Sequence, residues 1–443
     1  MNIKVDSRKV KRGDTFVALR STNDGHKYIE DAIAAGASLV VCEEGLYSVD
    51  TMIVNDTRDY LINYLKDNYY SQISKLKLIG ITGTNGKTTS AFLIHQVLNK
   101  LDIKCAYIGT IGLYIEKKIR DLPNTTPDIL DIYEILFECA EKEVEYVVME
   151  VSSHALDMRR VDGLEYDYTL FTNLTQDHLN YHGTMDNYCN AKQKLFKMLK
   201  SGGKSIVNVD DDYSKHFISK DTITYGFNKS DYQLSDYEII NNITYFKVNN
   251  NEYHIKLLGK HNVYNMLNVI IVLKDIGFSD MIIKEAISEL TPPPGRMDII
   301  HHKSNLAIVD YAHTPDAVEK IINAVREFAQ NNIITIVGCG GNRDKAKRPI
   351  MAKIATDLSD YVIFTSDNPR LEEPDEIIND MVDGLDNLNY EIESNREKAI
   401  KKGIQKLNNS DILLVLGKGH ETYQIIGDKK IDFDDKKIII DNL

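Results

Sequence analysis

The sequence KLIGITGTNGKTTSAFLIHQVLNKL, residues 77–101, decides the fold of the chain. Its first six residues predict a buried strand, and the residues from Thr88 onward predict a helix. Gly83 and Gly86 lie in the turn between them, where the backbone can wrap an anion. The helix N-terminus adds free N–H groups and a partial positive charge. This order of elements therefore predicts a phosphate-binding loop in a parallel α/β sheet.

The loop residues themselves indicate that the anion is a nucleotide. We expect Lys87 to reach the β- and γ-phosphates of ATP and the Thr88 hydroxyl to ligate Mg²⁺. The usual spacing has a glycine at position 81, where this chain has Ile81, so the generic pattern fails at one position. The alternative is a turn whose glycines serve only the bend, which Lys87 followed by Thr88 disfavours. The predicted ATP-binding residues of the loop are Gly83, Thr84, Asn85, Gly86, Lys87, Thr88 and Thr89.

Alternating strand and helix patterns on both sides of the loop predict an α/β protein with parallel strands. The segment 67–77, DNYYSQISKLK, is predicted to be a polar bridge into the central part of the chain. The other predicted elements are strands at 15–19, 38–44, 146–153, 168–174 and 205–210, helices at 28–36 and 262–277, and an antiparallel appendage at 237–259.

The triplet Pro292-Pro293-Pro294, followed by Gly295, is the clearest linker in the chain. Strand-like runs follow at 306–312, 333–341, 361–366 and 411–417, separated by helices, and predict a small doubly wound sheet. We therefore expect three domains, at residues 1–72, 73–291 and 292–443. They are a small N-terminal α/β domain, a central phosphate-loop domain with an antiparallel appendage, and a C-terminal Rossmann-like domain.

The composition narrows the class of partner. A formal net charge of -13 argues against a protein that binds nucleic acid or an anionic membrane, because both reward a basic surface. The first residues lack the apolar run of a signal peptide, and no run reaches the roughly 20 apolar residues of a membrane-spanning helix. The five scattered cysteines predict reduced thiols in a cytosolic protein.

Motifs spread along nearly the whole chain resemble one family. They are GTNGKTT at 83–89, DSRKV at 6–10, NTTPD at 124–128, MEVSSHALDMRR at 149–160, TNLTQDHLNYHG at 172–183, GKHNVYN at 259–265, DYAHTPD at 310–316, GCGGNRDKAKRP at 338–349, DNPR at 367–370 and GKGHE at 417–421. Together they resemble the Mur ligases of the MurE type, which add the third residue of the cell-wall peptide. The resemblance implies amide-bond formation driven by ATP through an acyl phosphate, and a uridine-nucleotide-binding N-terminal domain.

Three side chains are expected to join the phosphate loop in catalysis. Glu150 ends a predicted strand and His178 follows another, so both can face the loop, and the resemblance makes them Mg²⁺-site residues with Asp177 as a supporting neighbour. The alternative is that they are satisfied loop polar groups. Without the resemblance, the sequence pattern around Lys192 would indicate a lysine on the solvated face of an amphipathic helix. The resemblance instead implies a carbamylated Lys192, 14 residues after His178, that acts as an oxygen ligand for Mg²⁺.

The resemblance also assigns residues to the nucleotide-sugar substrate, UDP-N-acetylmuramoyl-dipeptide. Two positions depart from the family: Met158 stands where many relatives have Gln, and the stretch at 21–23 differs from the His-Gln of some relatives. At position 158 we therefore expect one polar contact of those relatives to be missing or to be supplied from elsewhere. The implied residues are Ser7, Ser21, Thr22 and Asn23 for the uridine end, Asn124, Thr125 and Thr126 for the pyrophosphate and sugar, and Ser152 and Arg160 for the peptide.

The remaining assignments concern adenine and the incoming amino acid. Asn262 and Asn265 are expected to contact adenine, and Asp310 and His313 to approach ATP, although His313 can also belong to a buried turn without a ligand. Arg370 can bind a carboxylate through two hydrogen bonds, which suits meso-diaminopimelate, or it can form a structural salt bridge. The expected amino-acid-binding residues are Arg343, Asp367, Asn368, Pro369, Arg370, Gly417 and Glu421, with Glu421 suited to the distal ammonium.

The sequence thus predicts a ligase that adds meso-diaminopimelate to the D-glutamate of the nucleotide-sugar dipeptide, using ATP and Mg²⁺. Lysine in place of diaminopimelate, a folylpolyglutamate synthase-like ligase, and a nucleotide-binding scaffold without catalysis remain as alternatives. We expect a cytoplasmic monomer with small-molecule substrates, no nucleic-acid partner and no membrane insertion.

Overall fold

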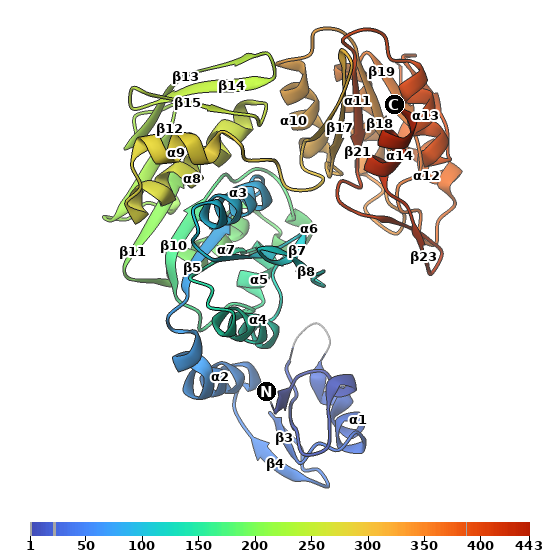
Figure 1. Cartoon of the computed structure of the whole chain (residues 1–443). Coiled ribbons are helices and arrows are strands. Elements are labelled where there is room, and N and C mark those ends of the chain that lie inside the picture. The colour runs from blue at the N-terminus through green and yellow to red at the C-terminus, as the bar shows by residue number, and fades with distance from the viewer. Residues whose placement is uncertain (1, 21–23, 387) are drawn as a thin grey trace. The chain divides into compact units, whose positions relative to one another are not determined.

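The computed structural model describes residues 2–20, 24–386 and 388–443. The chain divides into two compact units, Met1–Asp231 and Tyr232–Leu443. Strands and helices alternate in both (Figure 1), which confirms the predicted α/β class. Among the described residues, no helix combines the length and the apolar character needed to cross a membrane.

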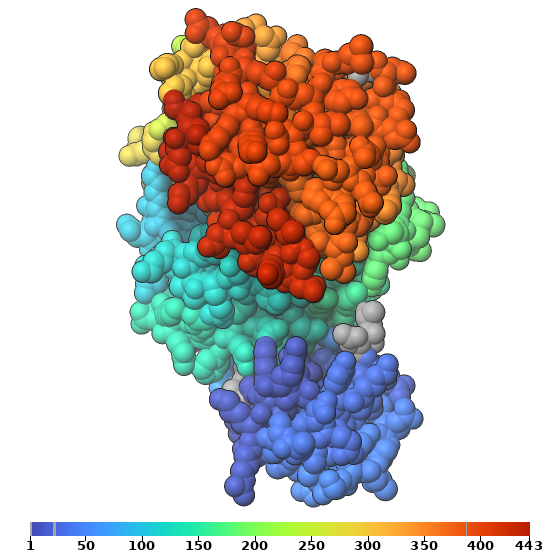
Figure 2. Space-filling view, turned by 90° about the vertical axis from the view of Figure 1, so that its right-hand side faces the viewer, coloured from blue at the N-terminus to red at the C-terminus, as the bar shows by residue number. Residues whose placement is uncertain are grey.

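The N-terminal part of the first unit is a small parallel sheet. Its strands lie in the order β1-β2-β3-β4, where the predicted strands at 15–19 and 38–44 correspond to β2 and β3. Figure 2 shows this part as the blue lobe. The bounds are β1 Ile3–Lys4, β2 Thr15–Val17, β3 Leu39–Cys42, β4 Asp50–Ile53, α1 Ile29–Ala34, and the short 3-10 helices η1 Ser7–Lys9 and η2 Gly25–Tyr28.

Helix α2, Thr57–Ile73, corrects one expectation from the sequence. It includes residues 67–73, which were predicted to be part of a polar bridge. The segment is polar because the helix buries only a narrow stripe that includes Leu61 and Leu65, while the opposite face is solvated. The Asp56 carboxylate accepts from the Asp59 N–H and caps the first turn.

The central sheet of the first unit is mixed. The strands from β12 to β6, in the order β12-β11-β10-β5-β9-β6, are parallel, and β7 and β8 extend the sheet antiparallel at the β6 edge. The hairpin of β7 and β8 was not predicted. The bounds are β5 Lys77–Thr82, β6 Cys105–Gly109, β7 Gly112–Ile115, β8 Lys117–Arg120, β9 Tyr146–Glu150, β10 Tyr166–Phe171, β11 Leu199–Asn208, β12 Thr222–Gly226, α3 Lys87–Lys100, α4 Ile129–Glu141, α5 Ser153–Asp157, α6 Leu179–His182, α7 Met185–Phe196 and η3 Ser214–His216.

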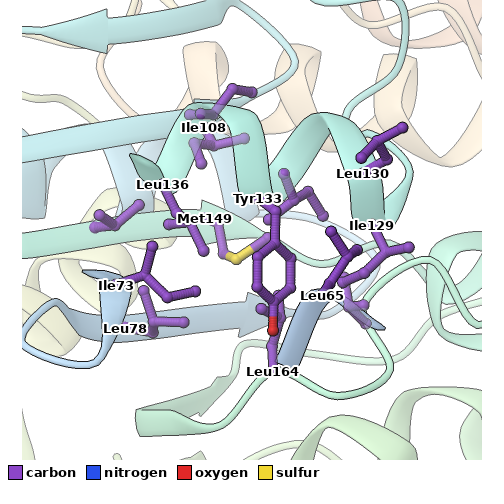
Figure 3. Close-up of a cluster of buried hydrophobic side chains, with 14 of the residues drawn as sticks. Leu65, Ile73, Leu78, Ile108, Ile129, Leu130, Tyr133, Leu136, Met149 and Leu164 are labelled. Atoms are coloured by element: carbon purple, nitrogen blue, oxygen red, sulfur yellow. The ribbon is translucent and has the colours of Figure 1, made fainter. Parts of the chain in front are cut away.

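A continuous apolar core lies between this sheet and helices α2 and α4 (Figure 3). Tyr133 and Leu136 of α4 pack with Leu78 of β5, Met149 of β9 and Ile73 of α2. Leu136 is fully buried, so its truncation to Ala would cost about 2–5 kcal/mol of stability. This packing fixes β5 and β9, the strands that lead into the predicted phosphate loop and Glu150.

The second unit begins with the predicted antiparallel strands and helix. Strands β13, β14 and β15 pair in sequence order, and α8 contains residues 262–276 of the helix predicted at 262–277. The bounds are β13 Tyr232–Ile240, β14 Ile243–Val248, β15 Asn251–Ile255, α8 Lys260–Ile276 and α9 Asp280–Ile287.

After Pro292–Pro294 the second unit forms its own sheet, in the order β16-β17-β21-β18-β19-β20. All neighbours are parallel except β16 and β17, so the predicted doubly wound sheet is confirmed, with an antiparallel edge strand added. The bounds are β16 Asp298–His302, β17 Asn305–Asp310, β18 Ile333–Val337, β19 Tyr361–Phe364, β20 Tyr390–Ile392, β21 Ile412–Leu416, β22 Tyr423–Ile426, β23 Lys429–Asp432, α10 Pro315–Arg326, α11 Lys347–Leu358, α12 Pro374–Val382, α13 Arg396–Gln405 and α14 Asp435–Asn442.

Candidate active site

The predicted phosphate loop follows β5 and is held by the residues that follow β10, the neighbouring strand. The Thr84 N–H donates to the Asn173 carbonyl at 2.8 Å, and the Asn85 N–H to the Asn173 side-chain oxygen at 2.9 Å. The Thr172 hydroxyl donates to the Asn85 carbonyl at 2.6 Å. At Gly83 φ is +150°, and a Cβ would lie 1.9 Å from the Thr172 hydroxyl oxygen. Only glycine fits this approach between the two strand ends.

Lys87 begins helix α3 and folds back over the loop. Its ammonium donates to the carbonyls of Gly83 and Thr84, at 2.8 Å in each case. Gly86 precedes it with φ of +84°, which turns the chain sharply into the helix. An ammonium beside the free N–H groups of a helix N-terminus is a favourable site for a phosphate.

Glu150, the last residue of β9, is fully buried beside the loop. One carboxylate oxygen accepts from the Thr88 hydroxyl at 2.8 Å. The other accepts from the Tyr107 hydroxyl at 2.5 Å and the Thr110 N–H at 2.9 Å. The structure therefore brings Glu150 and Thr88 together, because β5 and β9 are adjacent parallel strands whose carboxyl ends meet.

Lys192 lies on α7 and is buried, so the alternative of a solvated lysine is excluded. Its ammonium donates to the Gly83 carbonyl at 2.8 Å and lies 4.5 Å from the Tyr188 ring centroid. Burial lowers the pKa of Lys192 well below its ordinary value, and the positive charge of Lys87 lowers it further. A lower pKa makes the deprotonated amine more accessible, and this is the form that can react with carbon dioxide.

His178 lies at the N-terminus of α6, with a positive φ of +54° and nearly half of its side chain exposed. The centroid of its ring lies 4.8 Å from that of the His154 ring and 6.0 Å from that of the Tyr188 ring. Desolvation is the main cause that lowers its pKa to about 4; His154, Lys87 and Lys192 add to the effect, and Asp177 opposes it. The Tyr188 ring lies near both the His178 ring and the Lys192 ammonium, so the two side chains lie on the same side of the loop.

The residues assigned to the sugar and peptide gather next to Glu150. The Thr126 hydroxyl donates to the Glu150 carbonyl at 2.8 Å and accepts from the Ser152 N–H at 3.1 Å. The Thr125 and Thr110 hydroxyls are 3.1 Å apart. The Arg160 guanidinium donates to the Thr126 carbonyl at 3.3 Å. A loop after β8 and a turn after β9 thus form one surface with the phosphate loop.

The departure at Met158 has a visible structural consequence. The Met158 sulfur accepts from the Arg160 guanidinium at 3.3 Å, so this arginine is oriented by a thioether instead of an amide. Asn124 is exposed, and Ser7 lies in η1 of the N-terminal lobe. Residues Ser21, Thr22 and Asn23 lie outside the described residues.

The residues assigned to adenine and ATP in the second unit have internal partners. The Asn262 amide donates to the Leu258 carbonyl at 2.8 Å, and the Asn265 amide to the Asn262 side-chain oxygen at 3.1 Å. Asp310 is buried and accepts from the Met297 and Ala312 N–H groups at 2.7 and 2.8 Å.

Desolvation raises the pKa of Asp310, while the Arg296 charge and the two N–H groups oppose the shift. These contacts give Asp310 a structural place in the turn that carries His313. The His313 side chain is exposed, and its Nδ1 lies 2.7 Å from the Tyr311 carbonyl oxygen in the same turn.

The DNPR and GKGHE motifs meet at the carboxyl ends of β19 and β21. Asn368 donates from its amide to Glu421 at 2.9 Å. Asp367 is buried, and a Cβ on Gly417 would lie 2.5 Å from its carboxylate. Burial raises the pKa of Asp367 against the opposing charges of Arg396 and Lys418. Glu421 therefore presents a partly exposed carboxylate, and the buried Asn368 and Asp367 support it from within.

Arg370 lies just beyond this pair, and its backbone has a positive φ of +52°. The guanidinium donates to the Gly341 carbonyl at 3.0 Å and to the Asn368 carbonyl at 3.3 Å. Within residues 2–20, 24–386 and 388–443 it forms no ion pair, which excludes the structural salt bridge considered from the sequence. Arg343, on the preceding loop, is exposed.

Comparison with known proteins identifies the family. Models described as the Mur ligase family catalytic domain, the Mur ligase middle domain and the Mur ligase glutamate ligase domain match residues 1–68, 81–273 and 295–419. The chain belongs to the Mur ligase family. A Mur ligase of Fusobacterium nucleatum, named UDP-N-acetylmuramoyl-L-alanyl-D-glutamate--2,6-diaminopimelate ligase, is 44% identical over 98% of this chain and 92% of its own length. A protein of Clostridium botulinum with the same name is 42% identical over 99% and 94%.

Solved Mur ligase structures share the fold. One of a UDP-N-acetylmuramoyl-L-alanyl-D-glutamate--2,6-diaminopimelate ligase is 32% identical, with a TM-score of 0.71 over 99% of this chain and 94% of its own. The MurF ligase of Thermotoga maritima in complex with ADP is 18% identical, with a TM-score of 0.66 over 94% of both chains. At that identity the second likeness concerns the fold alone.

The donor set of this Mur ligase fits a magnesium ion that is shared with a phosphate. In the part of the chain that the structure describes, no three His, Cys, Asp or Glu side chains are grouped to hold a metal by themselves. Glu150 and Thr88 supply hard oxygen atoms next to the loop. Mg²⁺ commonly takes one or two protein oxygens and completes its shell with water and substrate phosphates.

Several residues of this Mur ligase site were missed from the sequence. Tyr107 and Thr110 hold the Glu150 carboxylate, and Thr172 and Asn173 hold the phosphate loop. Thr172 and Asn173 belong to a quoted motif, and their position after a predicted strand was the available signal. Tyr107 carried no signal, because a buried tyrosine in a strand is normally core.

Proposed function

We propose that the chain is the Mur ligase that joins meso-diaminopimelate to the D-glutamyl carboxylate of UDP-N-acetylmuramoyl-L-alanyl-D-glutamate, with ATP cleaved to ADP and phosphate. The observation that carries the proposal is the convergence of Lys87, Glu150 and Lys192 on the loop at residues 83–89. The names of relatives that are at least 42% identical over nearly the whole chain support this choice of substrate. None of this requires a protein or nucleic-acid partner.

The first step activates a carboxylate. An oxygen of the D-glutamyl carboxylate attacks the γ-phosphorus of ATP, the bond to the β-phosphate oxygen breaks, and ADP leaves. Lys87 and the first N–H groups of α3 stabilise the charge on the phosphoryl oxygens, which is the usual main source of rate in such transfers. Thr88 and Glu150, with His178 and a carbamylated Lys192, would hold Mg²⁺, which supplies further charge neutralisation.

The second step forms the amide. The amine of the incoming amino acid attacks the carbonyl carbon of the acyl phosphate, the C–O bond to phosphate breaks, and the nitrogen loses a proton. The amino acid is held by Asn368, Arg370 and Glu421, where the guanidinium takes the distal carboxylate and Glu421 the distal ammonium. Ser152 and Arg160 hold the acceptor peptide next to Glu150, and Thr126 contacts the sugar and pyrophosphate.

Arg370 favours diaminopimelate over lysine. The distal end of lysine has no carboxylate. The Arg370 guanidinium could therefore form no ion pair with lysine. The guanidinium has only carbonyl partners within the described residues, which leaves its charge available for a substrate. The carboxylate of Glu421 likewise suits the distal ammonium of the amino acid.

We also propose that the enzyme works as a cytoplasmic monomer, with domain boundaries near residues 72 and 291. The uridine end of the substrate would lie at Ser7 and residues 21–23, and adenine at Asn262 and Asn265, with Asp310 and His313 on the ATP side.

The experiment is a coupled assay of phosphate release with the purified chain, ATP, Mg²⁺ and the nucleotide-sugar dipeptide. Diaminopimelate, lysine and no amino acid are compared in parallel. Release that requires the dipeptide and diaminopimelate supports the proposal. A clear preference for lysine would change the assigned amino acid and leave the ligase reaction as proposed. Activity with a folate in place of the dipeptide would overturn both the assigned amino acid and the assigned acceptor.

A further inference from the structure

Lys418, the second residue of the GKGHE motif, is a buried cation that the proposed reaction does not use. Its side chain is fully buried at the carboxyl end of β21. The ammonium donates to a Glu421 carboxylate oxygen at 3.2 Å and to the Asn368 side-chain oxygen at 3.2 Å, and it lies 4.0 Å from the Asp367 carboxylate. A buried ammonium is costly unless it is paired, and this one is fully paired.

The contacts of Lys418 fix the side chains of Asn368 and Glu421. The Asn368 side-chain oxygen accepts from Lys418 and from the Ile425 N–H at 2.9 Å, so its amide nitrogen must point toward Glu421. The same Glu421 oxygen, Oε2, accepts from both Asn368 and Lys418. Two donors on one oxygen hold the carboxylate in a single orientation.

The second carboxylate oxygen of Glu421 remains available. Considering residues 2–20, 24–386 and 388–443 alone, Oε1 has no hydrogen bond or ion pair, and the side chain is 15% exposed. A partly exposed carboxylate with one oxygen anchored and the other open can receive an ammonium without reorganising.

We infer that Lys418 is a positioning residue that orients Glu421 and Asn368 so that Glu421 Oε1 receives the distal ammonium of the incoming amino acid. The inference rests on the proposed function and adds to it the group that sets the geometry of this subsite. Lys418 does not touch the substrate. It also offsets the negative charge of Asp367 and Glu421, which would otherwise repel each other in a buried site.

The test is a double-mutant cycle on Lys418→Met and Glu421→Gln, with the Michaelis constants for diaminopimelate, ATP and the dipeptide measured for each variant. Lys418→Met should raise the constant for diaminopimelate roughly ten- to hundred-fold, as loss of charged hydrogen bonds does, and leave the constant for ATP unchanged. The double variant should be no worse than Glu421→Gln, because Lys418 acts through Glu421.

Lys430→Met is the matched control, because Lys430 lies over the same Tyr423 ring as Lys418, on the exposed side, and contacts neither Asn368 nor Glu421 in the described chain. It should behave like the wild type. If Lys418→Met does not fold, Lys418→Arg, which keeps the charge and moves the donors, should show the same selective rise. An unchanged constant for diaminopimelate, or effects of the two substitutions that multiply, would overturn the inference. A wild-type chain inactive with diaminopimelate would instead refute the proposed function.

Discussion

The Lys192 ammonium and the Gly83 carbonyl oxygen are 2.8 Å apart, and Lys87 donates to the same oxygen at 2.8 Å. Two lysine side chains thus meet at one carbonyl, one buried and one at the mouth of the loop. Two cations at this distance repel each other, and the buried one loses its proton more easily. A deprotonated Lys192 is what carbamylation requires.

Replacement of Lys192 tests this chemistry. Lys192→Ala should lose most of the ligase activity, about a hundred-fold or more, because a metal-site oxygen is lost. Short carboxylates such as formate or acetate should restore part of the activity by supplying an oxygen ligand. Phosphate release at increasing carboxylate concentration measures this, with Lys194→Ala on the same helix as the control. Absence of rescue by any short carboxylate would count against a carbamate.

Burial of Lys192 also predicts a pH-dependent cost in stability. The pKa is lowered in the folded chain from its ordinary 10.5. Between these two pKa values the unfolded chain binds more protons, so folding becomes more favourable as pH rises toward 10.5. In buffer free of carbon dioxide, Lys192→Met should therefore raise Tm at pH 7. This advantage should shrink as the pH approaches 10. Calorimetric scans across that range measure it, and a constant difference would contradict the assigned cause.

Lys87→Met should abolish turnover while the fold is kept. The ammonium donates to the carbonyls of Gly83 and Thr84, both in the loop, so we expect its loss to affect the loop and not the rest of the fold. The loss should be about a thousand-fold, the scale for removal of one group that stabilises transition-state charge. Phosphate release gives the rate and circular dichroism the fold. Lys100→Met, at the far end of the same helix, is the control that should retain activity.

Glu150→Gln should separate the effect of the Glu150 charge on magnesium binding from the effect of its hydrogen bonds on stability. The amide can still accept from Tyr107 and Thr110, so Tm should change little. The Mg²⁺ concentration for half-maximal activity should rise about ten-fold or more, because a carboxylate near the ion is lost. Glu150→Ala, by contrast, leaves buried donors unpaired and should destabilise the chain by about 1–3 kcal/mol for each. A magnesium titration of each variant distinguishes these outcomes.

Gly83→Ala should damage the loop sterically. The added Cβ would meet the Thr172 hydroxyl, and φ at this position is one that L residues rarely adopt. We expect a loss of about 1–3 kcal/mol in stability and weaker nucleotide binding. Gly202→Ala is the control, because its φ is +82° but nothing lies within 4 Å of the added Cβ. Equal effects at both positions would show that backbone strain alone is responsible.

The sequence predicts those parts of the site that depend on local order along the chain. A strand, a glycine turn and a helix place the loop at 83–89, and the last residue of a predicted strand places Glu150, because both patterns are local. The resemblance supplied Lys192, whose helix looks amphipathic and solvated by itself. The predicted roles of these residues stay predictions.

Contacts between distant residues were not predictable from local patterns. Tyr107, Thr172 and Lys418 take their places from the pairing of strands and from loops far apart in sequence. Residues 67–73 look like a linker because the helix that contains them is polar over most of its surface. The inward orientation of Asp367 likewise depends on Gly417, fifty residues later.

The most direct measurement is mass analysis of the nucleotide product after incubation of the chain with ATP, Mg²⁺, UDP-N-acetylmuramoyl-L-alanyl-D-glutamate and an equimolar mixture of diaminopimelate and lysine. The account predicts one new product, with the mass of the dipeptide plus one diaminopimelate less water, and one ADP formed per product. A product that carries lysine, or ADP formed without any peptide product, would contradict it.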